Sequence, residues 1–375
     1  MEWKEYSLGD ISKLKYGKNV SAKLCKGPVP IFSGYRKIGT CNTINCKKNT
    51  VIVIARGAGG CGDVKLTKED CFLTNLSISV ELDKGICNAK WFYYNHLLNN
   101  LSFLNSGSAQ PQITIDSLSK YLIRIPPIII QRKIAGILSA LDSKIENNNK
   151  INANLEAQAE ALFKSWFVDF TPFKDQPFVD SELGPIPQGW KVGKLGDIAL
   201  QSTEKVLTRN DVKVLSPITT GKLVLSEEYF TKQVFSKSIR NYKIVKQGAF
   251  AYNPARVNIG SLGMNEFKFD GCVSPVYVVF ECLKGYSFFF DLFRKTEFFK
   301  QAVISFAIGG VRQTLNYSDF ALIDATIPPL NIVQSFNEIY LHLKKKISIN
   351  EEENQRLAAL RDTLLPKLMS GEIKL

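Results

Sequence analysis

Histidine is nearly absent from this chain of 375 residues, which contains only His96 and His342. Most acid–base mechanisms therefore lack their usual proton carrier. The sequence has no Walker-type phosphate loop, no histidine-activated nucleophile pattern and no clear nuclease-type carboxylate cluster. These absences argue against an enzyme and favour a protein that binds another molecule.

Long apolar runs and closely paired cysteines are also missing. No apolar run reaches the roughly 18 residues that suggest a membrane helix. The first ten residues include Glu2, Glu5 and Asp10, which are untypical of a signal peptide. None of the eight cysteines forms a Cys-x-x-Cys pair, so a zinc site would need Cys41 and Cys46 with remote ligands. We expect a cytoplasmic protein with reduced cysteines, no metal site and no membrane partner.

Positive charge is abundant, and it is concentrated in stretches without acids. The formal net charge is +13. Residues 13–48 contain nine Lys or Arg, and residues 229–265 contain six, with no Asp or Glu in either stretch. Tyrosines are interleaved with these cations. The pattern favours a polyanionic partner such as nucleic acid, although a Lys-rich composition or solvated loops would produce it too.

A long helical pattern occurs twice, at residues 134–166 and 336–368, an offset of 202 residues. Its apolar positions alternate steps of four and three, which is typical of a coiled-coil seam. The first copy would be about 50 Å long as a helix. Neither copy buries its apolar stripe alone, so we expect each to pack against the other.

Both helical copies have asparagine at the same two central seam positions. Antiparallel pairing would place Asn148 opposite Asn354 and Asn152 opposite Asn350. Paired amides satisfy each other and fix the register at some cost in stability. The alternative is a frayed or hinged helix centre at residues 147–149. The antiparallel arrangement would hold two globular domains at opposite ends of the helical rod.

The segments that precede the helices are duplicated as well. Trp3-x4-Leu-Gly-Asp-Ile recurs from Trp190, and Arg56-x3-Gly recurs from Arg256. Each copy ends in Ile-Pro-Pro, and the second has about 13 extra residues before Arg256. Proline is tolerated in the first turn of a helix, so each pair closes a domain and opens a helix. The predicted segments are domain 1 at 1–127, a helix at 128–170, a linker at 171–187, domain 2 at 188–329 and a helix at 330–375.

Short β-rich runs alternate with turns and short aromatic-rich helices in both domains. This mixture indicates α+β domains rather than a regular parallel α/β sheet. The predicted fold is therefore two similar mixed α/β domains separated by an antiparallel coiled coil, related by a pseudo-two-fold internal repeat. The expected strands are 51–55, 76–82, 244–252 (interrupted at 247–248) and 276–281, and the expected short helices are 88–100 and 288–299.

Two local motifs suggest enzyme chemistry but lack its context. Residues 57–62 form a Gly-x-Gly-x-x-Gly sequence after an apolar strand, yet no convincing helix follows to hold a phosphate. We prefer a turn that lets the backbone approach DNA, with a plain structural turn as the alternative. Residues 252–256, Tyr-Asn-Pro-Ala-Arg, lack the second proline and the aromatic of the amino-methyltransferase motif.

The junction between the two halves resembles a known family. Residues 162–170 (Leu-Phe-Lys-Ser-Trp-Phe-Val-Asp-Phe) and 182–190 (Glu-Leu-Gly-Pro-Ile-Pro-x-Gly-Trp) are similar to the central junction of type I restriction-modification specificity (S) subunits. Residues 364–373, Leu-Leu-Pro-Lys-Leu-x-Ser-Gly-Glu-Ile, resemble the C-terminal end of those subunits. The resemblance covers the whole chain in order, although Trp3 lacks the lead-in that precedes Trp190.

The resemblance implies a DNA-binding subunit without catalysis of its own. Each target recognition domain would recognise one half of a bipartite, asymmetric site in double-stranded DNA. The spacer helices would set the gap and dock two methyltransferase (M) subunits, which methylate adenine with S-adenosylmethionine. Restriction and motor (R) subunits would add cleavage driven by ATP with Mg²⁺. No cofactor is expected in this chain itself.

Candidate DNA-binding residues follow from the chemistry of bases and phosphates. Arg binds guanine, and Gln or Asn binds adenine, in two-hydrogen-bond contacts, whereas Lys and Arg neutralise phosphates. The candidates for base contacts are Arg56, Ser108, Gln110 and Gln112 in domain 1, and Arg256, Asn258, Arg312 and Gln313 in domain 2. The candidates for phosphate contacts are Lys13, Lys15, Lys18, Lys23, Lys37, Lys237, Arg240 and Lys243.

Two other functions fit parts of the sequence. The first is a protein-interaction scaffold, whose domains bind acidic proteins and whose rod oligomerises. The second retains DNA binding but serves a restriction-methylation enzyme of another type. Sequence-dependent DNA binding separates the first from our prediction, since a scaffold has no preference among DNA sequences.

Overall fold

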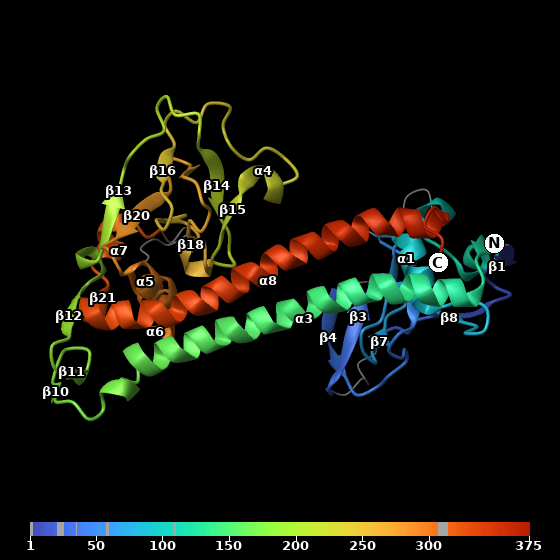
Figure 1. Cartoon of the computed structure of the whole chain (residues 1–375), viewed down its shortest axis with the longest axis horizontal. Helices are drawn as coiled ribbons and strands as arrows, with labels where there is room; N and C mark the ends of the chain where they lie inside the picture. The colour runs from blue at the N-terminus through green and yellow to red at the C-terminus, as the bar shows by residue number, and fades with distance from the viewer. Residues whose placement is uncertain (1–2, 21–25, 35, 58–59, 108–109, 307–313) are drawn as a thin grey trace. The chain divides into compact units, whose positions relative to one another are not determined.

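The computed structural model of the chain is shown in Figure 1, and it describes residues 3–20, 26–34, 36–57, 60–107, 110–306 and 314–375. The chain forms two compact units that do not follow chain order. Unit 1 comprises Met1–Lys150 and Asn350–Leu375, and unit 2 comprises Ile151–Ile349. Two long helices, α3 (Ile128–Phe167) and α8 (Leu330–Ser370), each contribute to both units. The predicted mixed α/β character and the two long helices are confirmed.

Unit 1 is built on a four-stranded antiparallel sheet of order β2–β8–β5–β6, a three-stranded sheet of order β4–β3–β7, and a β1–β9 pair. All four residues of β5 are buried, which explains its continuous Val-Ile-Val-Ile sequence in place of polar alternation. In the smaller sheet β7 runs parallel to β3. The strands are β1 (Lys4–Ser7), β2 (Ser12–Tyr16), β3 (Val29–Ser33), β4 (Arg36–Cys41), β5 (Val51–Ile54), β6 (Val64–Leu66), β7 (Phe72–Leu73), β8 (Ser77–Leu82) and β9 (Leu122–Ile125).

The core of unit 1 joins the sheet to helix α1 and to both long helices. Trp91 of α1 is fully buried, and it belongs to one apolar cluster with Val53, Leu138 and Leu365. The Asn88 side chain caps α1 by accepting the backbone N–H groups of residues 90 and 91. Besides the long helices, the helical segments are α1 (Ala89–Leu98), η1 (Ser102–Leu104) and α2 (Ile115–Ser119).

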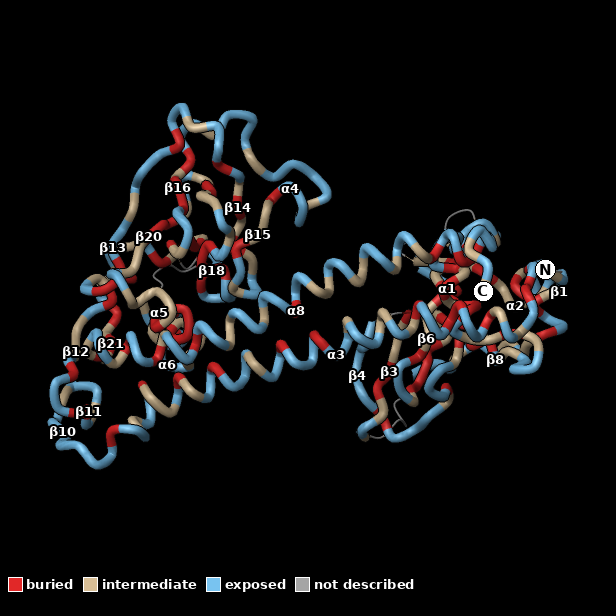
Figure 2. Tube along the Cα trace, viewed as in Figure 1, coloured by how far each residue is buried: buried red, intermediate tan, exposed pale blue. Residues whose placement is uncertain are grey.

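Polar contacts connect the parts of α3 and α8 that belong to unit 1. Arg361 lies 2.8 Å from Asp142, and Asn148 donates to the Asn354 side chain at 3.0 Å. These contacts show that the two helices run antiparallel in this unit. Helix α3 continues without a break through residues 147–149, so the hinged alternative is wrong. In Figure 2 both long helices are largely exposed with isolated buried positions, which include Asn148, Asn152 and Asn350.

Unit 2 contains two four-stranded sheets, of order β13–β20–β17–β18 and β15–β14–β19–β16, and the pairs β12–β21 and β10–β11. Within the second sheet, β19 runs parallel to β14. The strands are β10 (Phe178–Val179), β11 (Ile186–Pro187), β12 (Lys191–Lys194), β13 (Ala199–Ser202), β14 (Lys213–Pro217), β15 (Leu223–Leu225), β16 (Lys243–Val245), β17 (Phe250–Tyr252), β18 (Leu262–Met264), β19 (Gly271–Val273), β20 (Val278–Cys282) and β21 (Asp324–Ile327).

Aromatic side chains fill the core of unit 2. The rings of Phe250 and Phe280 are stacked with centroids 5.2 Å apart, and Phe290 meets Phe280 edge-on at 5.1 Å. The long helices join this core, because Phe163 of α3 lies 6.0 Å from Phe336 of α8. The remaining helical segments are η2 (Thr171–Phe173), η3 (Leu195–Asp197), α4 (Ser226–Tyr229), η4 (Val257–Ile259), α5 (Ser287–Phe293), α6 (Glu297–Phe306) and α7 (Tyr317–Ala321).

The single helix predicted at 288–299 is wrong, because two helices, α5 and α6, occupy this region. Thr296 separates them. Its hydroxyl donates to the carbonyl of Phe293 at 2.7 Å and accepts the N–H of Phe299 at 3.2 Å. This hydroxyl therefore ends one helix and caps the next.

The proline pairs act as predicted at the start of the long helices. Helices α3 and α8 begin directly after Pro127 and Pro329, whose carbonyls accept the first backbone N–H bonds, at 2.9 and 3.0 Å. Among the residues that the structure describes, none of the helices combines the length and apolar character that a membrane crossing requires.

Candidate nucleic-acid interface

In unit 1 the candidate interface begins where β5 ends. Ala55 is buried, but the next residue, Arg56, is exposed. The backbone of Arg56 forms an antiparallel bridge with Gln112, and the N–H of Ile113 donates to the carbonyl of Ala55 at 2.8 Å. Two base-contact candidates separated by more than fifty residues are therefore neighbours. The Asn105 side chain fixes this pairing by accepting the N–H of Gln112 at 2.7 Å.

Other basic residues lie at the same end of the unit 1 sheets. The backbone of Lys18, just beyond the end of β2, forms an isolated parallel β-bridge with Thr74. The N–H of Thr74 donates to the carbonyl of Phe32 in β3 at 3.0 Å. A Cβ built on Gly34, in the β3–β4 turn, would lie 3.9 Å from Ile54 at the end of β5. This turn therefore brings the exposed Arg36 to the end of the sheet where Arg56 lies.

The other candidates of unit 1 are more dispersed. Lys13 and Lys15 lie further back along β2, opposite Glu81 and Ser79, and Lys15 forms an exposed ion pair with Glu81 at 3.0 Å. Lys37 is exposed on β4, next to Arg36, and Gln110 is exposed close to Gln112. Lys23, Ser108, Arg312 and Gln313 lie outside the described residues.

In unit 2 the corresponding turn joins β17 to β18. Arg256 is exposed in this turn, and its carbonyl accepts the N–H of Ser261 at 3.1 Å. Asn258 is exposed two residues further along, in η4. The carbonyl of Pro254, two residues before Arg256, accepts the N–H of Leu315 at 3.1 Å.

The β17–β18 turn packs closely on the turn between β14 and β15. Gly260 has a φ of 94°, and a Cβ at this position would lie only 2.5 Å from the carbonyl oxygen of Thr219. Glycine is therefore required there for both backbone conformation and space. The β14–β15 turn carries Thr219, Thr220 and Lys222, which are all exposed. The two turns form one surface.

Sequence reasoning missed Arg36 and Lys222, because both depend on which turns meet in space. A sequence signal was present in each case: Gly34 and Gly221 mark the turns, and Arg36 lies in the acid-free stretch at 13–48. Both glycines have positive φ, 61° and 79°. The close approach of these turns to Arg56 and Arg256, however, is a tertiary feature.

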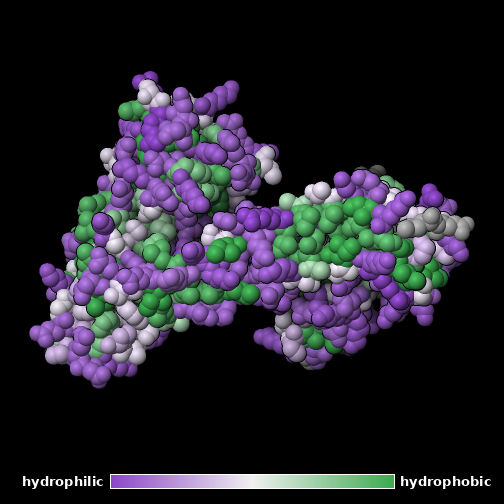
Figure 3. All heavy atoms as spheres, in the orientation of Figure 1, coloured by the Kyte–Doolittle hydropathy of each residue, from purple (hydrophilic) through white to green (hydrophobic). Residues whose placement is uncertain are grey.

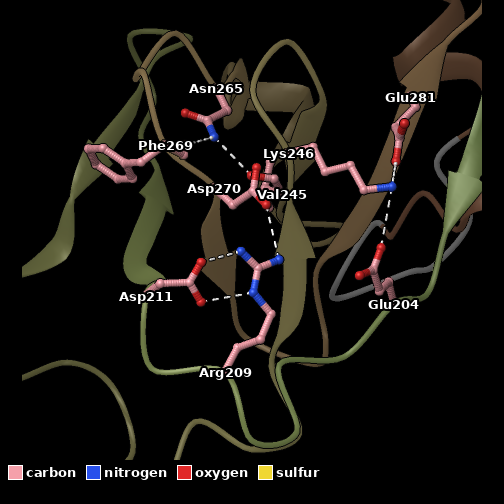
Figure 4. A network of polar contacts seen from close by, with 9 residues as sticks. All are labelled: Glu204, Arg209, Asp211, Val245, Lys246, Asn265, Phe269, Asp270 and Glu281. Carbon is pink, nitrogen blue, oxygen red and sulfur yellow. Dashed lines mark hydrogen bonds and ion pairs between the residues drawn. The ribbon is translucent and has the colours of Figure 1, made fainter.

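Several other cations of unit 2 already have protein partners. Figure 4 shows Lys246 between Glu204 and Glu281, at 3.3 and 3.1 Å. It also shows Arg209 bound to Asp211 and Asp270, at 2.6 and 3.0 Å, and the Arg209 guanidinium lowers the pKa of Asp211 to about 2. Among the described residues, in contrast, neither Arg56 nor Arg256 forms an ion pair.

The phosphate candidates of unit 2 differ in their availability. Lys237 and Arg240 are exposed in the segment before β16. The Lys243 ammonium is half-buried and donates to the carbonyl of Tyr277 at 2.7 Å. Burial lowers the pKa of Lys243. We conclude that Lys243 has a structural contact that Lys237 and Arg240 lack among the described residues.

The glycine-rich segment at 57–62 is a turn between strands. Gly62 has a φ of 96°, and a Cβ there would lie 2.3 Å from the backbone nitrogen of Ser102. Strand β6 follows it, so the described part of this segment offers no helix N-terminus for a phosphate. This geometry does not fit a nucleotide-binding turn. Ala58 and Gly59 lie outside the described residues.

The chain is similar to proteins of type I restriction-modification systems. Residues 1–157 match the type I restriction modification DNA specificity domain. The chain is 28% identical to the type I restriction enzyme MjaIX specificity subunit of Methanocaldococcus jannaschii over 347 residues, 87% of this chain and 78% of the relative. It is 23% identical to the HindI specificity subunit of Haemophilus influenzae, with 99% of this chain and 100% of the relative covered.

A solved structure agrees in fold. The type I restriction-modification S subunit from M. genitalium superposes with a TM-score of 0.64 at 18% identity, covering 98% of this chain and 96% of the other. The chain is thus similar over most of its length to type I restriction-modification specificity subunits.

Proposed function

We propose that this chain recognises a bipartite, asymmetric site in double-stranded DNA, with one half-site bound by unit 1 and the other by unit 2. The observation that carries the proposal is the exposed arginine that follows a buried central strand in each unit, Arg56 after β5 and Arg256 after β17. An exposed guanidinium without a carboxylate partner in the described structure is suited to a guanine edge or a phosphate.

We infer an internal repeat from the strand order, and such a repeat would give two recognition domains of one kind. The order β2–β8–β5–β6 in unit 1 is matched by β13–β20–β17–β18 in unit 2. Likewise, β3 is flanked by antiparallel β4 and parallel β7, as β14 is by β15 and β19. Shared topology with different turn residues is what two domains with different DNA preferences require.

We assign base contacts to the turn residues and phosphate contacts to the exposed cations around them. In unit 1 the base-contact set is Arg56, Gln110 and Gln112; in unit 2 it is Arg256 and Asn258. Phosphate contacts would come from Lys18, Arg36 and Lys37 in unit 1, and from Lys222, Lys237 and Arg240 in unit 2. All of these side chains except the half-buried Gln112 are exposed.

The long helices are proposed to form an antiparallel coiled coil that sets the gap between half-sites. The Asn148–Asn354 hydrogen bond supports a register fixed by paired amides, since a shifted register would oppose asparagine with apolar side chains. Figure 3 shows apolar residues gathered over α8 and the adjoining part of α3 in unit 1, and Ile137 and Leu360 are 37% and 47% exposed there. Such surface suits the docking of methyltransferase subunits.

The rest of the activity is assigned to partner subunits of a cytoplasmic complex. Methyltransferase subunits would hold S-adenosylmethionine, and restriction subunits would use ATP and Mg²⁺. This chain would contribute recognition and no catalytic group.

Mapping of methylated bases in cells that express the system tests the proposal. The expected result is a methylated adenine motif in two separated parts, which disappears when the gene for this chain is deleted. A single uninterrupted motif would contradict two recognition domains. Binding without any sequence preference would instead support an interaction scaffold.

Replacement of Arg56 by alanine is expected to reduce discrimination at one base position of one half-site by about 1–3 kcal/mol. Stability should change by no more than about 0.5 kcal/mol, because the side chain is exposed. Competition binding against DNA duplexes that differ at single positions measures the effect.

The matched control is Lys68→Ala in the same unit. Lys68 is exposed beyond β6 and lies 3.6 Å from Glu146 of α3. This control should leave every position of the recognised sequence unchanged. If Arg56→Ala weakens binding to all sequences equally, Arg56 contacts a phosphate instead of a base.

Insertion of four residues after Asn148 is expected to change the gap between the half-sites while both half-site sequences remain the same. Four residues extend a helix by about 6 Å, slightly more than one turn. Motif mapping of the variant gives the new gap. Altered half-site sequences would show that the helices do more than set the spacing.

A further inference from the structure

Arg294 is an arginine of unit 2 that is almost completely buried. Its side chain is 11% exposed, and that of its partner Asp291 is 7% exposed. The guanidinium Nη2 lies 2.6 Å from the Asp291 carboxylate, and Nε donates to the same oxygen at 3.0 Å. Asp291 lies in the last turn of α5, and Arg294 follows this helix directly as its C-cap residue.

The guanidinium also holds the two turns assigned to DNA recognition. Nη1 donates to the carbonyl of Leu262 at 2.9 Å, at the start of β18 directly after the Arg256 turn. Nη2 donates to the carbonyl of Gly221 at 3.1 Å, in the β14–β15 turn beside Lys222. One side chain therefore binds the backbone of the β14–β15 turn and of the first residue of β18, where the Arg256 turn ends.

Asp291 is connected in addition to long helix α8. The hydroxyl of Tyr340 donates to its second carboxylate oxygen at 3.2 Å. Burial opposes ionisation of Asp291, but the charge and hydrogen bonds of Arg294 outweigh it and hold the pKa of this carboxyl below its ordinary value. The pair is therefore ionic, and its hydrogen bonds connect α8 and α5 to the two turns.

The turn around Gly221 is shaped to admit the guanidinium. Gly221 has a φ of 79°, and a Cβ there would lie 2.9 Å from Nη1 of Arg294. Any larger residue would displace the arginine as well as strain the backbone. Ser261 adds a further tie between the turns, because its hydroxyl donates to the carbonyl of Pro217 at 2.9 Å.

Stability alone is a weak reason for such a pair. Removing two charges from water costs several kcal/mol, which is often not recovered relative to well-packed apolar residues. An arginine does, however, fix several carbonyl groups at once in a planar arrangement, which lysine cannot do. That property matters where backbone positions must be held to within a fraction of an ångström.

We propose that Arg294 is a positioning residue for DNA sequence recognition by unit 2, in which it fixes the turns that carry Arg256 and Lys222 relative to each other and to α8. The proposal rests on the proposed function, since it assumes that these turns contact DNA. Arg294 itself contacts no base. It makes recognition precise by removing conformational freedom from the side chains that do.

The test selects bound sequences from randomised double-stranded DNA with the full-length protein and its variants. Arg56→Ala and Arg256→Ala first assign each half-site to a unit. Arg294→Lys retains the charge beside Asp291 but loses the two-carbonyl bridge. We expect it to reduce discrimination in the half-site of unit 2 at least about tenfold, with the half-site of unit 1 and the salt dependence of binding unchanged.

Two further variants make the outcome decisive. Tyr340→Phe removes only the bond to Asp291 and should produce a smaller loss in the same half-site. If Arg294→Lys does not fold, the discrimination measured for Tyr340→Phe tests the positioning role instead. Lys295→Ala is the control, because the neighbouring Lys295 forms an exposed ion pair with Glu160 at 3.2 Å and should affect neither half-site.

Unchanged discrimination in a folded Arg294→Lys variant overturns the positioning role. Equal losses in both half-sites overturn it too, because they indicate a general structural defect. Failure of the proposed function has a different signature: the unmodified protein itself would then show no preference among sequences.

Discussion

Between 50 and 200 mM salt, the affinity of the full-length chain for its DNA site is expected to fall about a thousandfold. The physical cause is counterion release, in which each phosphate that a lysine or arginine neutralises frees a bound cation. About six such contacts give this slope. The exposed cations assigned to them are Lys18, Arg36, Lys37, Lys222, Lys237 and Arg240. Titration by fluorescence anisotropy at five salt concentrations measures this decrease in DNA affinity.

Single variants test whether these particular cations are responsible. Loss of one phosphate contact, as in Lys37→Ala, should reduce the logarithmic salt slope by about one without altering the preferred sequence. Lys246→Ala is the control, because Lys246 is already paired with Glu204 and Glu281 (Figure 4). An affinity that hardly responds to salt would remove the electrostatic part of the proposed function.

Unit 1 is expected to lose up to about 3 kcal/mol of stability between pH 6.5 and 4 through His96 alone. This histidine is buried in α1, and burial lowers its pKa from 6.5 to about 4. Its Nδ1 lies 2.8 Å from the carbonyl of Phe92, and Nε2 lies 3.2 Å from the Tyr121 hydroxyl, so the neutral ring satisfies both contacts. As the pH falls below 6.5 the unfolded chain takes up a proton that the folded chain refuses, and stability decreases until the folded form is protonated as well.

Denaturant unfolding at several pH values checks this expectation. In His96→Gln the part of the acid destabilisation between pH 6.5 and 4 that is due to the imidazole should disappear, although the variant starts from a lower stability because core packing changes. The control is His342→Gln, because His342 is exposed on α8 and makes none of the contacts of His96, so the acid destabilisation assigned to His96 should persist in this variant. Equal pH dependence in all three proteins would show that His96 titrates normally.

Local chemistry made much of the fold predictable. The four-and-three spacing of apolar residues predicted both long helices, and the prolines at 126–127 and 328–329 marked where they begin. Strands such as β5 were visible as short β-branched runs. The division at Thr296 was missed, because a threonine inside an apolar helical pattern acts as a cap only when its hydroxyl finds the right backbone groups.

The candidate interface was predictable in part. Arg56 and Arg256 were predicted because they occupy equivalent places in recurring sequence motifs, and Gln112 because its segment recurs too; their DNA contacts stay predictions. Lys243 was chosen for its charge, but its ammonium is held by the carbonyl of Tyr277. Arg36, Lys222 and Arg294 were missed, since nothing in their own neighbourhood indicates which turn they will meet.

The sequence by itself determined the two long helices, strands such as β5, the recurrence of short motifs and the excess of positive charge, because these depend on residue type and on spacing along one segment. The tertiary structure alone decided which cations have carboxylate partners and which turns share a surface. These properties depend on contacts between segments distant in the chain, such as Arg56 with Gln112 and Arg294 with Gly221. Such contacts form only when the sheets and helices pack, so they leave no regular spacing in the sequence.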